Sequence, residues 1–100
     1  MYIIVGEQRA SVLRETHTVL SLEKIAHEGT EDRAYCVVPS DAVNFMEIPQ
    51  LEQHVDLHEQ FVIEYEKGNY QYCRDAAEHL YGKFGGELDS FYDEILKRIS

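Results

Sequence analysis

Two histidines, His54 and His58, have the spacing in this sequence that most clearly suggests chemistry. A separation of four residues puts both side chains on one face of a helix, where two imidazoles can share a metal ion. Asp56 and Glu59 point to other sides of the same helix, so the pattern is not the HExxH arrangement of metalloproteases. The pair therefore predicts a metal site with His54 and His58 as ligands.

Packing in the core is the alternative interpretation of His58, and the sequence favours it. His58 shares its helix face with apolar residues such as Val55 and Val62, where a histidine usually packs and hydrogen-bonds one backbone carbonyl. Cys73 and His79, on the following helix, could instead complete a metal site with the histidine pair. The sequence leaves open whether this face is buried core or an open groove.

No set of residues forms a recognisable catalytic signature. Cys36 and Cys73 lie outside any CxxC pair, which predicts two free, buried thiols in a reducing cytoplasm. A cysteine nucleophile has no supporting motif, and Cys73 falls on an apolar stripe where thiols are usually inert. The chain lacks GxGxxG and lacks a P-loop lysine. We therefore assign no catalytic residue, expect no cofactor, and interpret the protein as non-enzymatic.

The charge of the chain restricts its partners. Its 19 acidic and 9 basic residues give a net charge of −10, and both halves are acidic. Nucleic-acid binding needs clustered Lys and Arg to neutralise phosphates, and an anionic membrane would repel such a protein. A protein partner with basic character suits this charge, as does an acidic mimic of nucleic acid that occupies a DNA-binding protein. The apolar run after Met1 is too short for a signal peptide or a membrane span, which predicts a cytoplasmic protein.

Seven tyrosines stand out in a chain without tryptophan. Those in the second half that sit in predicted helices are Tyr65, Tyr70, Tyr72, Tyr81 and Tyr92. Tyrosines of this kind either pack in the core with the hydroxyl at the surface or serve as hot spots of protein interfaces. Tyr72 lies off the apolar stripe of its helix, so we predict that it is exposed and contacts a partner protein.

The first 38 residues have the character of β-strands. Short β-branched or alternating runs over residues 2–5, 16–25 and 33–38 predict three strands. Residues 9–14 are either a fourth strand or an irregular return. The polar, glycine-containing stretch 27–32 predicts a turn. This half of the chain therefore predicts a three- or four-stranded antiparallel meander.

A connector over residues 39–48 and a helical part over residues 49–100 complete one predicted domain of residues 1–100. In the connector, Val43 and Phe45 are expected to cover one end of the sheet. Breaks at Gly68-Asn69 and Gly85-Gly86 separate apolar stripes with helical spacing. The expected helices span residues 49–67, 70–84 and 87–99. The predicted fold class is α+β, with the meander packed against three C-terminal helices.

The chain between Tyr65 and Leu80 resembles the inter-helix region of a tetratricopeptide repeat. Tyr65-Glu66-Lys67-Gly68-Asn69-Tyr70, followed by Ala76-Ala77, matches the way that family ends one helix in Gly and packs small residues between the pair. Cys73 stands where alanine is usual, and the chain holds one such unit. The resemblance implies a helical hairpin over residues 65–80.

A second resemblance covers the whole chain and concerns small uncharacterised proteins of T4-like marine cyanophages and ocean metagenomes. It is carried by the motifs AYCVV at residues 34–38, LHE at 57–59 and HLYGKFGGELDSFY at 79–92. It implies a phage-encoded protein of the host cytoplasm and transfers no catalytic residue. Together these observations predict a non-enzymatic interaction or regulatory module whose partner is a host protein, a phage protein or a second copy. The alternatives are a metal protein or enzyme built on His54 and His58, and the acidic mimic.

Overall fold

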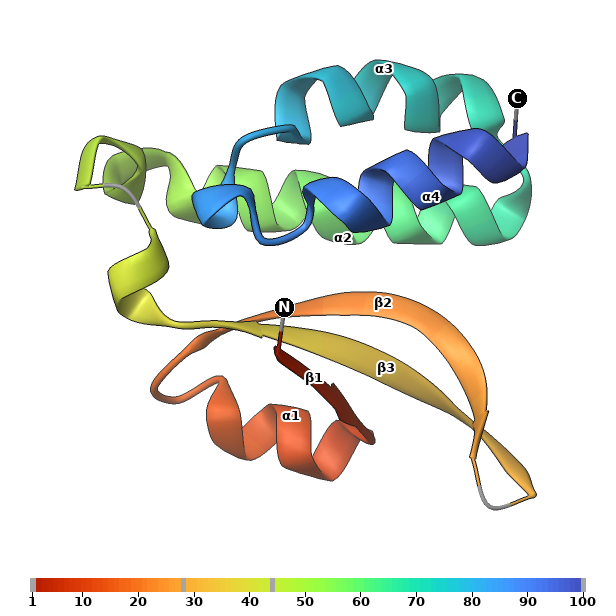
Figure 1. The fold of residues 1–100 in the computed structure, drawn as a ribbon, viewed down its shortest axis with the longest axis horizontal. Coiled ribbons are helices and arrows are strands. Elements are labelled where there is room, and N and C mark those ends of the chain that lie inside the picture. The colour runs from red at the N-terminus through yellow and green to blue at the C-terminus, as the bar shows by residue number, and fades with distance from the viewer. Residues whose placement is uncertain (1, 28, 44, 100) are drawn as a thin grey trace.

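The computed structural model describes residues 2–27, 29–43 and 45–99. Glu28 in the predicted turn and Asn44 in the predicted connector lie outside these residues. The chain forms an α+β fold in layers, with one short helix below a sheet and three longer helices above it (Figure 1). This agrees with the predicted fold class. Within the described ranges, no helix is long and apolar enough to cross a membrane.

The sheet has three antiparallel strands: β1 (Tyr2–Val5), β2 (Thr18–His27) and β3 (Thr30–Val38). Their order is β1-β3-β2, so the last strand lies in the middle, whereas a meander would pair strands in sequence order. The burial of β3 fits this central position, because residues 34–38 are all buried and pack in the cores on both faces of the sheet. Residues 2–5 pair with residues 37–34 of β3.

The predicted strand or irregular return at residues 9–14 is instead part of a helix, α1 (Glu7–Leu13). Gly6, at φ 102°, turns the chain out of β1 in a conformation that a side chain would strain. Ala10 of α1 is fully buried and packs with Ile4, Val19 and residues of β3 in a small second core. The helix thereby covers one face of the sheet and replaces a fourth strand.

The β2–β3 hairpin is longer than predicted. β2 continues to His27 and β3 begins at Thr30, because the polar residues at both ends pair with each other across the ladder. Between Ser21 and Lys24 the register of β2 shifts by a bulge. This irregularity lies where the strand passes beneath helix α2 (Leu51–Lys67), whose Glu59 bonds Ser21.

The connector consists of two 3-10 turns, η1 (Ser40–Ala42) and η2 (Phe45–Gln50). Val43 is buried as predicted, but the prediction for Phe45 was wrong, because its side chain is 82 % exposed. Ala42 and Val43 pack against the main core in its place. The connector therefore leaves Phe45 on the outside of the molecule.

The helices above the sheet are α2, α3 (Tyr70–Leu80) and α4 (Asp89–Ile99). Gly68 ends α2 in the left-handed conformation at the predicted break, and the Asn69 side chain caps α3 by accepting a hydrogen bond from the Tyr72 N–H at 3.5 Å. Helix α3 ends before residue 84, because the chain turns at Gly82, whose φ is 78°. The loop that follows contains one more 3-10 turn, η3 (Phe84–Gly86).

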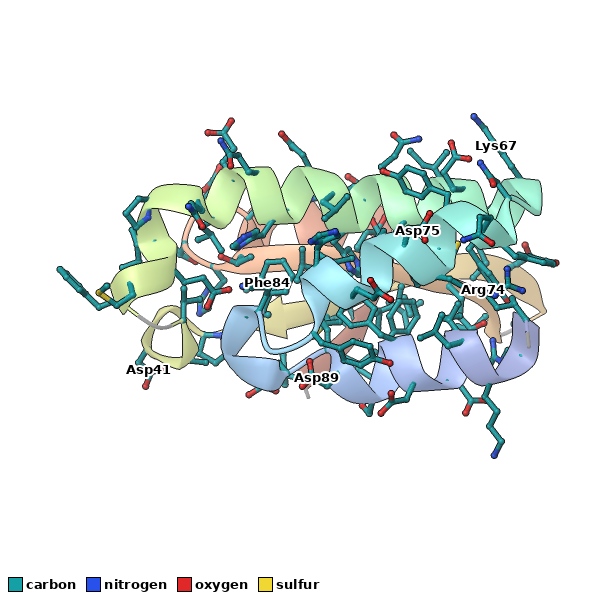
Figure 2. All side chains as sticks on the ribbon, turned by 90° about the horizontal axis from the view of Figure 1, so that it is seen from above. Asp41, Lys67, Arg74, Asp75, Phe84 and Asp89 are labelled. Carbon is teal, nitrogen blue, oxygen red and sulfur yellow. The ribbon has the colours of Figure 1, made fainter. Side chains whose placement is uncertain are left out.

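The main core fills the space between the sheet and the three helices. Helices α2 and α4 lie over the sheet, and α3 lies above and between them (Figures 1 and 2). The largest fully buried side chains are Tyr92, Phe61, Phe84 and Leu20. Burial on this scale, at about 25 cal/mol per Å² of apolar surface, is the main term that holds the helices to the sheet.

Candidate functional site

His58 is fully buried in the main core and uses both of its ring nitrogens. Its Nε2 lies 2.6 Å from the carbonyl oxygen of Ser21, and its Nδ1 lies 2.8 Å from the hydroxyl of Tyr92. Because a carbonyl only accepts, Nε2 carries the proton and Nδ1 accepts from Tyr92. Burial lowers the pKa of His58 to about 4, so the ring is neutral at pH 7.

This network joins three elements. Glu59, beside His58 on α2, accepts hydrogen bonds from both the N–H and the hydroxyl of Ser21 on β2, at 3.3 and 3.0 Å. Burial raises the pKa of the Glu59 carboxyl and of the Tyr92 hydroxyl, which comes from α4. The polar groups of β2, α2 and α4 thus satisfy one another, as buried polar groups must. The His58 network therefore has a structural role, because it holds β2, α2 and α4 together in the core.

His54, one helical turn before His58, has different surroundings. Its side chain is 15 % exposed, and its Nδ1 is buried with no hydrogen-bond partner among the described residues. The nearest charged group is the Glu47 carboxylate, whose Oε1 lies 3.8 Å from this nitrogen, beyond hydrogen-bond range. A buried nitrogen without a partner is costly, so His54 favours an incoming group that bonds it.

The Glu47 carboxylate is held in place by the loop between α3 and α4. Its Oε1 accepts a hydrogen bond from the Phe84 N–H at 2.6 Å, and the side chain is only 9 % exposed. Phe84 has a φ of 55°, which is unusual for a residue with a large side chain. A Cβ at Gly85 would lie 2.1 Å from the carbonyl oxygen of Ala42, so only glycine lets the loop approach the connector. The turn predicted at Gly85-Gly86 is confirmed.

A hollow of about 250 Å³ opens where the connector, the start of α2 and this loop meet. Its lining residues are Met46, Glu47, Gln50, His54, Gly82 and Lys83. The connector lies at one end of the molecule, with Asp41 on its outer side and Phe84 further in (Figure 2). The hollow therefore brings the side chains of Glu47, His54 and Lys83 to one place.

Three large apolar side chains are exposed on η2, the segment that contributes to this hollow. Phe45 and Met46 are each 82 % exposed, and Ile48 is 54 % exposed. Such a group of exposed apolar side chains is typical of a binding surface. We call these three residues, together with the hollow, the connector site.

The structure separates the two histidines of the predicted metal site. A metal at His58 would have to break two hydrogen bonds inside the core. Over residues 2–27, 29–43 and 45–99, no group of three or more His, Cys, Asp or Glu side chains is arranged to hold a metal ion. Cys73 is buried and lies 3.7 Å from the Phe61 carbonyl oxygen, whereas His79 is exposed. Metal binding by His54 and His58 stays a prediction.

Both cysteines are free and buried, as the sequence predicts. Burial raises the pKa of the Cys36 thiol to about 11 and also raises that of Cys73. Both thiols are therefore protonated at neutral pH, which gives neither of them the character of a nucleophile.

Tyr72 is less exposed than the sequence predicts. The side chain is half-buried and packs against the main core, because α3 lies between α2 and α4 and little of its surface points away from both. A role for Tyr72 in partner binding stays a prediction, and Tyr72 does not line the hollow at the connector site.

Sequence reasoning missed the connector site. Its signal was present as the run Phe45-Met46-Glu47-Ile48, three large apolar residues in a segment between Pro39 and Pro49 with no helical or alternating pattern. Apolar residues without a period that would bury them are candidates for an exposed surface. The contribution of Lys83 and the Phe84 N–H to the connector site has no such signal in the sequence. It depends on how the loop between α3 and α4 folds back onto the connector.

Comparison with protein-family models, curated proteins and solved structures gives no match to this chain. The function is therefore argued from the geometry of the site.

Proposed function

We propose that this protein is a non-enzymatic interaction module that binds a partner protein through the connector site. The observation that supports the proposal is the exposure of Phe45, Met46 and Ile48 on one short segment. The segment is held in place, because Glu47 bonds the Phe84 N–H and Gly85 rests against Ala42. An apolar surface fixed in one conformation loses little entropy on binding, as a hot spot requires.

The hollow beside these residues indicates the chemistry of the partner. An N–H or O–H group of the partner, or a Lys or Arg side chain, can enter this hollow and approach the Glu47 carboxylate and the His54 ring. The net charge of −10 steers a basic surface toward the protein at long range. We therefore expect an apolar partner surface with a cationic or hydrogen-bond donating side chain at its centre.

The resemblance to small cyanophage proteins indicates where the protein would act. It favours the cytoplasm of an infected cyanobacterium, with a host or phage protein as the partner. The acidic character of the chain and the chemistry of the connector site fit a host protein and a phage protein equally well. The identity of the partner is the object of the test.

Capture from marine cyanobacterial lysate, infected and uninfected, tests the proposal with three baits. These are the wild type, the double variant Phe45→Ser with Met46→Ser, and the control Ile63→Ser, which removes an exposed apolar side chain from α2. We expect one stoichiometric protein on the wild-type and control baits and its loss from the double variant. Washes of increasing salt separate the contribution of charge from that of the apolar side chains.

Two results would overturn the proposal. One is a partner retained equally by the double variant, and the other is a partner lost equally from the Ile63→Ser control. Phe45 and Met46 are each 82 % exposed, so the double variant is expected to change the free energy of unfolding by less than about 0.5 kcal/mol. Circular dichroism and urea unfolding of each bait exclude misfolding as the cause of a loss.

A further inference from the structure

The open edge of the sheet points to a second interaction surface. We propose that β1 pairs with β1 of a second copy of this chain around a two-fold axis, which joins the two three-stranded sheets into one continuous sheet. This surface is separate from the connector site, so either proposal can fail alone.

β1 stands at the edge of the sheet. Among the described residues it pairs with β3 alone, and Figure 1 shows it in front of β3 with no element on its outer side. The outward N–H and C=O groups of an edge strand are a template for another strand. β1 has the sequence Tyr2-Ile3-Ile4-Val5, without the Lys or Pro that usually protects such an edge.

Apolar hollows flank β1 on both faces of the sheet. On the α1 side, a hollow of about 550 Å³ is lined mainly by apolar side chains, including Tyr2, Val12 and Leu13. On the α4 side, a hollow of about 290 Å³ includes Ile3 and Phe91. Tyr2, Ile3 and Val12 are each more than half exposed. An added strand would bond the backbone of β1 and place alternate side chains in the two hollows, which is the geometry of strand addition.

The distribution of charge favours a second copy as the occupant. In a chain of net charge −10, most surfaces repel a second copy, but β1 carries no charged residue. Among the described residues, Arg9 is the charged residue that lines the α1-side hollow, so a basic peptide finds no acidic group in that part of the surface. The α4-side hollow includes Glu23 and Glu94, and both form ion pairs with Arg98, so these carboxylates are partly neutralised when two β1 edges approach. The two-fold axis then lets each edge satisfy the other with the same residues.

Sedimentation equilibrium tests this proposal, over roughly a hundredfold range of protein concentration. We expect the wild type to dimerise and Ile3→Lys to raise the dissociation constant of the dimer at least tenfold, because the ammonium would be buried against its symmetry mate. The matched control is Phe45→Lys, which adds the same charge at the connector site and should leave the dimer intact. Tyr2→Lys tests the other face of the same strand and serves if Ile3→Lys does not fold.

Three outcomes would overturn the proposal. They are a wild type that stays monomeric at every concentration, a dimer that persists in folded Ile3→Lys and Tyr2→Lys, and a dimer that Phe45→Lys dissociates as strongly as the β1 variants. Amide hydrogen exchange adds a direct readout, since β1 amides should gain protection as the dimer forms. Unchanged exchange in β1 on dimerisation would place the interface elsewhere.

Discussion

His54 and His58 lie one helical turn apart on the same face of α2, yet they belong to two different kinds of surroundings. His58 is closed within the core and has a partner for each nitrogen. His54 borders a hollow and has a buried nitrogen without a partner. Helical spacing fixes which way a side chain points, while the elements opposite decide what it can do.

The elements opposite the two residues differ. His58 faces Ser21 of β2 and Tyr92 of α4, which are parts of regular elements packed on both sides of it. His54 faces the connector and the loop that follows α3, where Glu47 and Phe84 meet. Regular elements close a core, whereas two irregular segments leave a hollow between them.

The substitution His58→Ala is expected to have the largest effect on stability. It removes a fully buried ring and leaves the Ser21 carbonyl and the Tyr92 hydroxyl without their partner, so we expect a loss of about 3 kcal/mol in the free energy of unfolding. Urea unfolding followed by circular dichroism measures it. A loss below about 1 kcal/mol would contradict a core role for His58.

Acidification should weaken the core through the same residue. The pKa of His58 is about 4 in the folded protein and about 6.5 when unfolded, so the unfolded chain takes up the proton first as pH falls. Stability is therefore complete above pH 6.5 and is lost between about pH 6.5 and 4, by roughly 3 kcal/mol.

Glu59 opposes this effect, because its raised pKa favours protonation of the folded state as pH falls. The free energies of unfolding of the wild type and His58→Gln, measured at a series of pH values, separate the effect of His58 on stability from that of Glu59. The difference between the two proteins should shrink toward pH 4. A difference that stays constant with pH would show that His58 is not held neutral by burial.

Tyr92→Phe is expected to have a smaller effect on the same network. It removes only the hydroxyl that bonds the Nδ1 of His58 and leaves the ring packing in place. We expect a loss of about 1 kcal/mol in stability, and less than that when the same change is made in the His58→Ala background. Equal losses in both backgrounds, measured by urea unfolding, would mean that the hydroxyl acts independently of His58.

His54→Ala should cost less stability than His58→Ala, because its Nδ1 has no hydrogen bond to lose and the change removes only the packing of a ring that is 15 % exposed. The same change should weaken partner binding, since it removes the imidazole from the hollow. A destabilisation as large as that of His58→Ala would place His54 in the core as well. Thermal unfolding of the two variants under one condition decides between these outcomes.

Much of the fold follows from local signals in the sequence. Gly68 and Asn69 stop one helix and start the next through the cap geometry that their residue types favour. The strands at residues 2–5 and 33–38 follow from β-branched runs. The strand order does not follow from such local signals. Pairing β1 with β3 depends on the path of α1, which short-range patterns do not encode.

The candidate site was less predictable for a physical reason. Periodicity placed His54 and His58 on one face but carried no information about the loop that reaches back to Glu47. That contact joins residues 37 positions apart and depends on Phe84 adopting a positive φ and on Gly85 approaching Ala42. Such features arise from tertiary packing, which overrides local preference.

Site-specific photocrosslinking tests whether the connector site, and not the rest of the surface, contacts a partner. Phe45→p-benzoylphenylalanine places the reactive group at the connector site, and Ile63→p-benzoylphenylalanine places it on the exposed face of α2. In cyanobacterial lysate, position 45 should form one covalent adduct with a single protein, and position 63 should not. Equal adducts from both positions, or an adduct from position 63 alone, would contradict the account.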